Sequence, residues 1–224
     1  MTLKKLAGET AIYGLSHIMP RVLNFLVMTV YMTYRFNNPA DFGIFSELYS
    51  YATIILSLMV FRMDTAYFRF ASRDGEAKGG MVYETTFAIM AIISTVMVVL
   101  MLAASQSIAA FLGYPQDAHY VQWFAWILAL DAYTTLVYAR FRLEGRPFRF
   151  LMFRVANVLF TVFFVLFFLE LLPRLWPSMM KAVGQWTGIN KELDYVFLSN
   201  LLASLLVFLA MVPEMLKMRL AVNR

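Results

Sequence analysis

Six stretches of about 20 or more mostly apolar residues recur along this chain of 224 residues, and they constrain its fold more than any other feature. They run over 10–34, 42–61, 82–104, 120–141, 150–171 and 195–215. A helix of about 20 apolar residues crosses the hydrocarbon core of a bilayer, where the backbone must satisfy its own hydrogen bonds. We therefore expect an all-α fold: a polytopic integral membrane helical bundle with six transmembrane helices, forming a single domain over 1–224.

The composition agrees with a membrane class and argues against several functions. The chain is 61% hydrophobic and 15% charged, whereas a soluble domain is about 45–50% apolar and about 25% charged. It has no cysteine and two histidines, and it contains no H-E-x-x-H, G-x-S-x-G or P-loop motif. We expect no enzyme, no catalytic residue, no metal and no cofactor, with a membrane enzyme as a weakly supported alternative.

The basic residues predict the orientation of the bundle, because cytoplasmic segments are enriched in lysine and arginine. With the N-terminus inside, thirteen of the 19 basic residues fall on the inner side: Lys4, Lys5, Arg69, Arg73, Lys78, Arg140, Arg142, Arg146, Arg149, Arg154, Lys217, Arg219 and Arg224. Four fall outside: Arg35, Arg174, Lys181 and Lys191. Both termini are thus predicted to be cytoplasmic, and the net charge of +5 needs no nucleic-acid partner. The outer loop 172–194 is either a short surface helix or disordered.

Polar residues inside the apolar stretches mark one face of each helix. In the first stretch the spacing of i, i+4, i+7 and i+11 places on one stripe Thr10, Gly14, His17, Arg21 and Asn24. Pro20 predicts a kink beside Arg21. In the fourth stretch a second stripe holds Asp131, Thr134, Thr135 and Tyr138. The second stretch adds Glu47, Ser50 and Tyr51, and the sixth adds Asn200 and Ser204.

These stripes have two interpretations. In the structural one, Arg21 pairs with Asp131 and the hydroxyl groups form interhelical hydrogen bonds. In the functional one, ionisable groups inside a membrane mark a ligand site or pathway, and the stripes line a hydrated cavity. We favour the structural role for the small hydroxyl groups and the functional role for Arg21 and Asp131. An arginine in such a cavity suits an anion, above all a phosphate, which it can hold with two hydrogen bonds.

Three further stretches resemble one family. They are FRMDTAYFRFASRDGE (61–76), ALDAYTTLVYARFRLEGRPFRFLMFRVANV (129–158) and DYVFLSNLLASLLVFLAMVPEMLK (194–217), which follow the opening LKKLAGETAIYGLSHIMPRVLNFLVM. Together they resemble, in order, the N-terminal half of the bacterial polysaccharide and lipopolysaccharide (O-antigen) flippases. That family is a branch of the multidrug/oligosaccharidyl-lipid/polysaccharide exporter superfamily. Arg62 departs from the pattern, since the family often has glycine there.

The resemblance implies a transporter of the bacterial cytoplasmic (inner) membrane. Its substrate would be an undecaprenyl-diphosphate-linked oligosaccharide for polysaccharide or lipopolysaccharide biosynthesis, moved between leaflets by alternating access around a cationic cavity. Arg21 matches an arginine that the family directs at the pyrophosphate. The residues expected to bind substrate are His17, Arg21, Asn24, Glu47, Asp131, Thr134 and Tyr138. Coupling to a proton or sodium gradient is common in the superfamily, and Asp131 or Glu47 are the candidates for titration.

Family members have two lobes, whereas this chain has six predicted spans. We expect one N-terminal lobe of a flippase-type transporter: a truncated or fragmentary product that lacks its C-terminal lobe, or a protein that pairs with a second copy. Two other functions stay open. A six-span accessory subunit of a polysaccharide-assembly complex would need no hydrated cavity, and a multidrug exporter of the same superfamily would favour acidic residues over Arg21.

Overall fold

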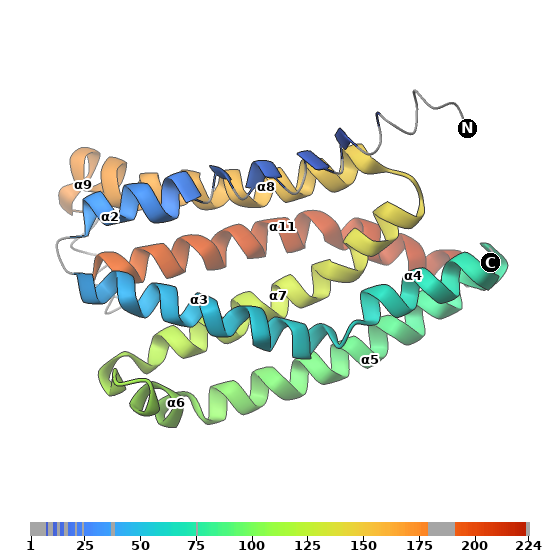
Figure 1. The fold of residues 1–224 in the computed structure, drawn as a ribbon, viewed down its shortest axis with the longest axis horizontal. Helices are drawn as coiled ribbons and strands as arrows, with labels where there is room; N and C mark the ends of the chain where they lie inside the picture. Colours follow the sequence, from blue (N-terminus) through green and yellow to red (C-terminus); the bar gives the residue numbers. More distant parts are fainter. Residues whose placement is uncertain are drawn as a thin grey trace.

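The computed structural model shows only helices among its regular elements, within the residues that it describes (Figure 1). Those residues are 8, 11–12, 14–15, 18–20, 22–23, 25–36, 39–74, 76–178 and 191–222. In chain order the elements are η1 (Phe25–Tyr31), α2 (Met32–Arg35), α3 (Pro39–Val60), α4 (Met63–Asp74), α5 (Glu76–Ala103), α6 (Ser105–Phe111), η2 (Pro115–Asp117), α7 (Ala118–Leu143), α8 (Pro147–Leu166), η3 (Phe167–Leu171), α9 (Leu172–Leu175) and α11 (Glu192–Val222).

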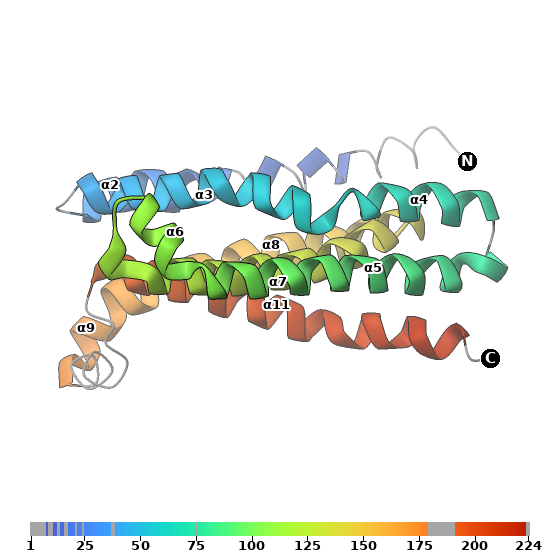
Figure 2. The same cartoon turned by 90° about the horizontal axis from the view of Figure 1, so that it is seen from below.

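The long helices run alternately up and down along one common axis (Figures 1 and 2). α11 packs most extensively against α7 and α8, and α5 packs against both α4 and α7. The turn between α6 and α7 contains Gly113 and lies at the same end of the bundle as the starts of α3 and α11. The turn between α7 and α8 contains Gly145 and lies at the opposite end, beside α4. We call these the Gly113 end and the Gly145 end.

Four helical segments are long and apolar enough to cross a membrane, which indicates a membrane protein. They are 40–72, 80–103, 147–175 and 192–216, and they correspond to the second, third, fifth and sixth predicted spans. The fourth predicted span is a helix of 26 residues, α7, but it does not meet the same measure of apolarity. Most of its residues from Tyr120 onwards are buried between other helices. The first predicted span lies partly outside the described residues.

The turns form where glycine and proline predict them. Gly113 has φ +90° and Gly145 has φ +63°, backbone conformations that glycine adopts without the steric cost of a Cβ. Pro39 and Pro147 are the first residues of α3 and α8, a position where the missing N–H costs nothing. The loop after residue 171 begins with the short α9, and most of the remainder lies outside the described residues.

The sequence did not predict the break between α3 and α4. Phe61 (φ 47°) and Arg62 (φ 54°) are consecutive left-handed residues, and neither is glycine. The amide of Phe61 donates to the carbonyl of Ser57 at 3.0 Å, which closes α3. The amides of Thr65 and Ala66 donate to the carbonyl of Arg62 at 3.1 Å, which opens α4. The chain therefore stays helical past the predicted end at residue 61, as a second and more polar helix.

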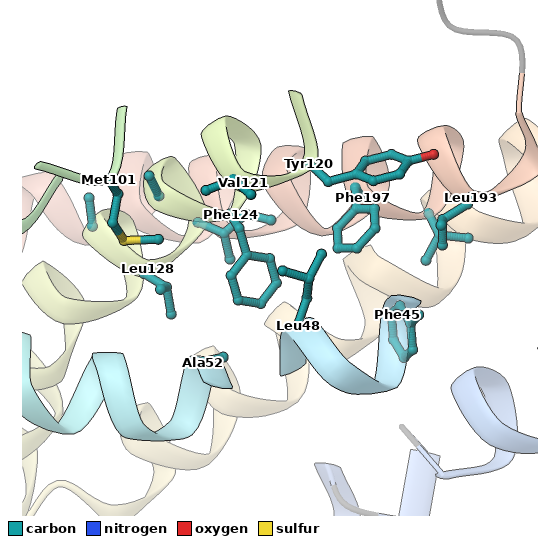
Figure 3. Packing of buried hydrophobic residues seen from close by; sticks show 14 of the residues in the cluster. Phe45, Leu48, Ala52, Met101, Tyr120, Val121, Phe124, Leu128, Leu193 and Phe197 are labelled. Carbon is teal, nitrogen blue, oxygen red and sulfur yellow. The ribbon is translucent and has the colours of Figure 1, made fainter. Parts of the chain in front are cut away.

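The two ends of the bundle are held differently. Near the Gly113 end, aromatic and aliphatic side chains of α3, α5, α7 and α11 form one large core (Figure 3). Within it the ring of Phe124 meets the rings of Tyr49 and Phe197 edge-on at 5.1 and 6.0 Å between centroids. Toward the Gly145 end the buried apolar residues separate into two smaller clusters, one around Tyr67 and Tyr83 and one around Phe141 and Phe150.

Ion pairs tie the helices together at the Gly113 end. Lys191 Nζ lies 2.7 Å from both carboxylate oxygens of Asp117, and Arg35 lies 2.6 Å from Glu192. The buried Asp194 accepts hydrogen bonds from the Tyr120 hydroxyl at 2.6 Å and the Lys191 amide at 2.8 Å. These contacts hold the start of α11 against α7 and α2.

Candidate functional site

A cavity of about 490 Å³ lies between α3, the start of α4, α7 and α8. It contains charged groups, and two of its walls, α3 and α8, belong to segments of membrane-spanning length and composition. We call it the central cavity, and it is lined by Tyr49, Ala52, Thr53, Leu56, Ser57, Val60, Arg62, Asp64, Phe124, Ile127, Leu128, Asp131, Thr135 and Arg154.

Asp131 stands on the α7 wall of this cavity and is partly accessible. Its carboxylate oxygen Oδ1 accepts a hydrogen bond of 2.9 Å from the hydroxyl of Ser204, which reaches across from α11. The backbone carbonyl of Asp131 accepts two more hydrogen bonds of 2.9 Å, from the hydroxyls of Thr134 and Thr135. The hydroxyl groups of both threonines thus donate to the backbone of their own helix. Ser204 is the residue that holds the Asp131 carboxylate.

Arg154 stands on the α8 wall. Its guanidinium carbon lies 4.7 Å from the centre of the Tyr138 ring and 5.7 Å from that of Phe150, distances typical of a cation–π contact. Its positive charge acts on the Asp131 carboxylate. Among the described residues, no carboxylate lies within 4 Å of Arg154 and no hydrogen bond holds it. The aromatic rings stabilise the positive charge of Arg154 but do not accept its N–H groups in directed hydrogen bonds. Within the described residues, the five N–H donors of the guanidinium therefore have no protein acceptor.

A second pair of opposite charges lies at the side of the cavity nearer the Gly145 end. Arg62 lines the cavity directly at the break between α3 and α4, and Asp64 follows one residue into α4. The charged groups of the described lining are thus two arginines and two aspartates. The cavity is strongly polar in places and close to neutral in sum.

The opposite side of the cavity is closed. Phe124, Ile127 and Leu128 line the cavity and also belong to the large apolar core that fills the bundle toward the Gly113 end. Beyond that core lie the ion pairs of Lys191 with Asp117 and of Arg35 with Glu192. The apolar core therefore separates the cavity from these ion pairs at the Gly113 end.

The structure separates the predicted site residues into groups. Asp131 lines the central cavity, and Tyr138 lies beneath the guanidinium of Arg154. Thr134 is buried and bonded to its own helix. His17, Arg21 and Asn24 lie outside the described residues.

Glu47 does not line the central cavity. It lies near Tyr114, in the turn at the Gly113 end: burial raises the pKa of the Tyr114 hydroxyl, and the negative charge of Glu47 raises it further. The same hydroxyl is buried and has no hydrogen-bond partner in the part of the chain that the structure describes. Glu47 and Asp131 are consequently placed in two different environments.

Sequence reasoning missed Arg154 and Arg62 as cavity residues. Arg154 was counted with the cytoplasmic basic residues, although it falls within the predicted span 150–171. Its spacing of four residues from Phe150 puts both on one helix face, which is the signal that could have identified a cation–π pair. Arg62 directly follows the predicted span 42–61, and no local pattern predicts that the chain turns there into the cavity.

The described residues contain no group of three or more His, Cys, Asp or Glu side chains arranged to hold a metal ion. The arrangement can do something else: present a guanidinium and a carboxylate to a polar ligand inside a membrane-length bundle. Comparison of the chain with family models, with curated proteins and with solved structures found no match.

Proposed function

We propose that the chain forms one half of a transporter that flips a diphosphate-linked, lipid-anchored oligosaccharide across the bacterial inner membrane. The oligosaccharide would serve the biosynthesis of cell-surface polysaccharide or lipopolysaccharide, and transport would proceed by alternating access. The observation that carries this proposal is Arg154, whose guanidinium faces the central cavity with no carboxylate partner among the described residues.

A diphosphate matches what Arg154 offers. An arginine within a bilayer costs about 2.5–3.5 kcal/mol on insertion scales. The aromatic rings and the charge of Asp131 act on Arg154, and an anion would add a direct hydrogen-bonding partner. A phosphate group accepts two parallel N–H bonds from one guanidinium, and Arg62 can provide a second cation from the same cavity. Asp131, held by Ser204, limits the attraction. A transporter needs that limit, because the substrate must also leave.

The walls of the cavity support the half-transporter part of the proposal. On α3, Thr53 and Ser57 are exposed, and on α8 Arg154 is exposed. Polar groups that face lipid tails cost several kcal/mol each when they lack partners. A C-terminal lobe, or a second copy of this chain, would cover them and complete the cavity around the substrate.

The test is to replace Arg154 in the chromosomal gene and to measure the accumulation of lipid-linked oligosaccharide on the cytoplasmic side. We expect Arg154→Gln to block flipping while the protein remains inserted, and Arg154→Lys to retain partial activity, since lysine keeps the charge but loses the paired donors. Arg174→Gln is the matched control, because Arg174 is exposed and pairs with Glu170 at the Gly113 end. Parental flipping by Arg154→Gln would remove the basis of the proposal.

Arg21 can be tested in the same assay, because the sequence also assigns it to the cavity. We expect Arg21→Ala to abolish flipping and the double variant Arg21→Ala with Asp131→Ala to remain inactive. If the double variant recovers flipping that each single variant has lost, Arg21 serves only to neutralise Asp131, and its role in binding substrate is wrong.

One observation favours a second candidate, a multidrug exporter. Asp131 shares the cavity with the aromatic rings of Tyr49 and Phe124, and a carboxylate beside aromatic faces suits an organic cation. Efflux of ethidium from cells separates the two candidates. Efflux that depends on Asp131 and persists in Arg154→Gln would favour the exporter, whereas flipping that depends on Arg154 favours the oligosaccharide flippase.

A further inference from the structure

A second cavity adjoins the first on the side of the Gly145 end. It has a volume of about 370 Å³ and is lined by Asp64, Thr65 and Phe68 of α4 and by Arg142 of α7. We call it the Arg142 recess. Asp64 lines both this recess and the central cavity, so one carboxylate stands between the two spaces.

The contact between Asp64 and Arg142 is loose. Their nearest atoms, Oδ2 and Nη2, are 3.6 Å apart, which is longer than a hydrogen bond. The Arg142 side chain is 40% exposed and that of Asp64 is 21% exposed. Ion pairs with this exposure contribute little to stability, so a doubly charged anion that reaches Arg142 can take the place of the Asp64 carboxylate.

The backbone around Asp64 permits that exchange. Asp64 is in the first turn of α4, directly after the left-handed residues Phe61 and Arg62 that separate α4 from α3. A joint of two strained residues lets a short helix shift without moving its neighbour. A small shift of α4 would withdraw Asp64 from Arg142 and would leave α3 in place.

We propose that the Arg142 recess is a second anion subsite, which receives a phosphate-type group from the face predicted to be cytoplasmic before that group reaches the central cavity. Arg142 binds the anion and the Thr65 hydroxyl lies beside it, while Asp64 is the counter-ion that the anion displaces. The anion then passes Arg62 to reach Arg154. This proposal rests on the proposed function, and it adds where the substrate binds first and which residue competes with it.

The experiment is a double-variant cycle on the purified full chain in nanodiscs of phosphatidylcholine, with inorganic pyrophosphate as the probe and calorimetry as the readout. We expect Arg142→Gln to weaken binding about tenfold, because charge-assisted hydrogen bonds are lost. Asp64→Asn removes the competitor and should strengthen binding severalfold. In the Arg142→Gln background Asp64→Asn should no longer strengthen it, because Asp64 acts through Arg142.

Arg146→Gln is the control for general surface charge. Arg146 belongs to the same turn and is 45% exposed, but it pairs with Glu144 and lines neither cavity. A loss as large as that of Arg142→Gln would show unspecific attraction and would overturn the subsite. Independent effects of Asp64→Asn and Arg142→Gln would overturn it as well.

Two further comparisons distinguish a failure of the Arg142 subsite from a failure of the proposed transport function. If Arg154→Gln abolishes pyrophosphate binding and the Arg142 variants have no effect, the central site stands and the recess is not a subsite. If no variant and no parent binds pyrophosphate, both proposals fall. Native mass spectrometry in phosphatidylglycerol nanodiscs tests the other source of phosphate. Loss of bound phosphatidylglycerol in Arg142→Gln, with unchanged pyrophosphate binding, would assign the recess to a resident lipid and overturn a role in substrate uptake.

Discussion

Arg140 and Arg154 lie on adjacent helices, and their surroundings are opposite. The Arg140 side chain is almost fully buried, lies 2.5 Å from Glu144 and donates to the backbone carbonyl of Glu214 at 2.9 Å. Glu214 in turn pairs with Arg149 at 2.6 Å, so α7, α8 and α11 meet in one network. Arg154 is exposed to the central cavity and rests on the faces of aromatic rings.

The difference shows how a fixed charge and an available charge can be distinguished. The guanidinium of Arg140 donates to the carboxylate of Glu144 and to the backbone carbonyl of Glu214, so protein acceptors already engage it. The positive charge of Arg154 is stabilised by aromatic ring faces, and within the part of the chain that the structure describes no acceptor takes its N–H donors, which a ligand could therefore use. We therefore expect Arg140 to govern stability and Arg154 to govern transport.

The largest effect expected from this comparison is the loss of Arg140. The loss of Arg140 removes a charge-assisted hydrogen bond to Glu144 and the side-chain donor to the carbonyl of the buried Glu214, a cost of about 3 kcal/mol in all. Arg140→Gln should therefore lower the melting temperature sharply and reduce the yield of folded chain, as measured by thermal denaturation of the purified protein in detergent.

Arg154→Gln is the matched variant for stability. We expect its free energy of unfolding to change by about 1 kcal/mol or less, the size of an exposed cation–π contact. The comparison fails if Arg154→Gln unfolds the protein as readily as Arg140→Gln does, because Arg154 would then be a structural residue as well.

The same contrast explains which parts of the molecule the sequence predicts. The lengths of the apolar stretches predict α3, α5, α8 and α11, because backbone polar groups exposed to lipid are costly unless a helix pairs them. Proline and glycine place the turns at Gly113 and Gly145. These effects are local, and each can be read from a window of residues.

The candidate site depends on contacts that no such window contains. The sequence predicts Asp131 as a polar residue inside a span, but its hydrogen-bond partner Ser204 lies on a helix 73 residues away in the chain. Arg140 and Arg154 look alike in sequence, since each lies near the basic turn between two spans. Only the packing of α11 against α7 and α8 buries one and leaves the other in a cavity.

A second buried charge extends the comparison to the Gly113 end. Asp194 has a side chain only 4% exposed and accepts hydrogen bonds from Tyr120 and the Lys191 amide. Hydrogen bonds to charged groups contribute about 1.5–3 kcal/mol each, so Asp194→Asn should cost about 2 kcal/mol. Its matched control is Asp117→Asn, because Asp117 pairs with the half-exposed Lys191 side chain and should cost less than about 1 kcal/mol. Equal melting temperatures for the two variants would refute the ranking.

A smaller effect is expected at Ser204, whose hydroxyl donates to the Asp131 carboxylate. Ser204→Ala removes the hydrogen bond to Asp131 and should cost about 1 kcal/mol, the usual net value for one such bond. Since Asp131 also faces the cavity, its carboxylate gains freedom to turn toward Arg154. We therefore expect weaker pyrophosphate binding in Ser204→Ala, and unchanged binding would show that Ser204 does not control the orientation of Asp131.

An effect of about the same size is expected at Arg62, a cavity arginine that lies on strained backbone. Its φ of 54° lies in the left-handed region, which costs a non-glycine residue about 1–2 kcal/mol. Glycine carries no such penalty, so Arg62→Gly should be more stable than Arg62→Ala by about 1 kcal/mol, although both variants lose the same charge.

Thermal denaturation of the two variants measures the strain, and pyrophosphate binding measures the charge. If both variants bind the anion equally weakly but melt at different temperatures, the side chain serves the cavity and the backbone bears the cost. If they melt together, the break between α3 and α4 is relaxed in the folded protein and the proposed joint for Asp64 loses its support.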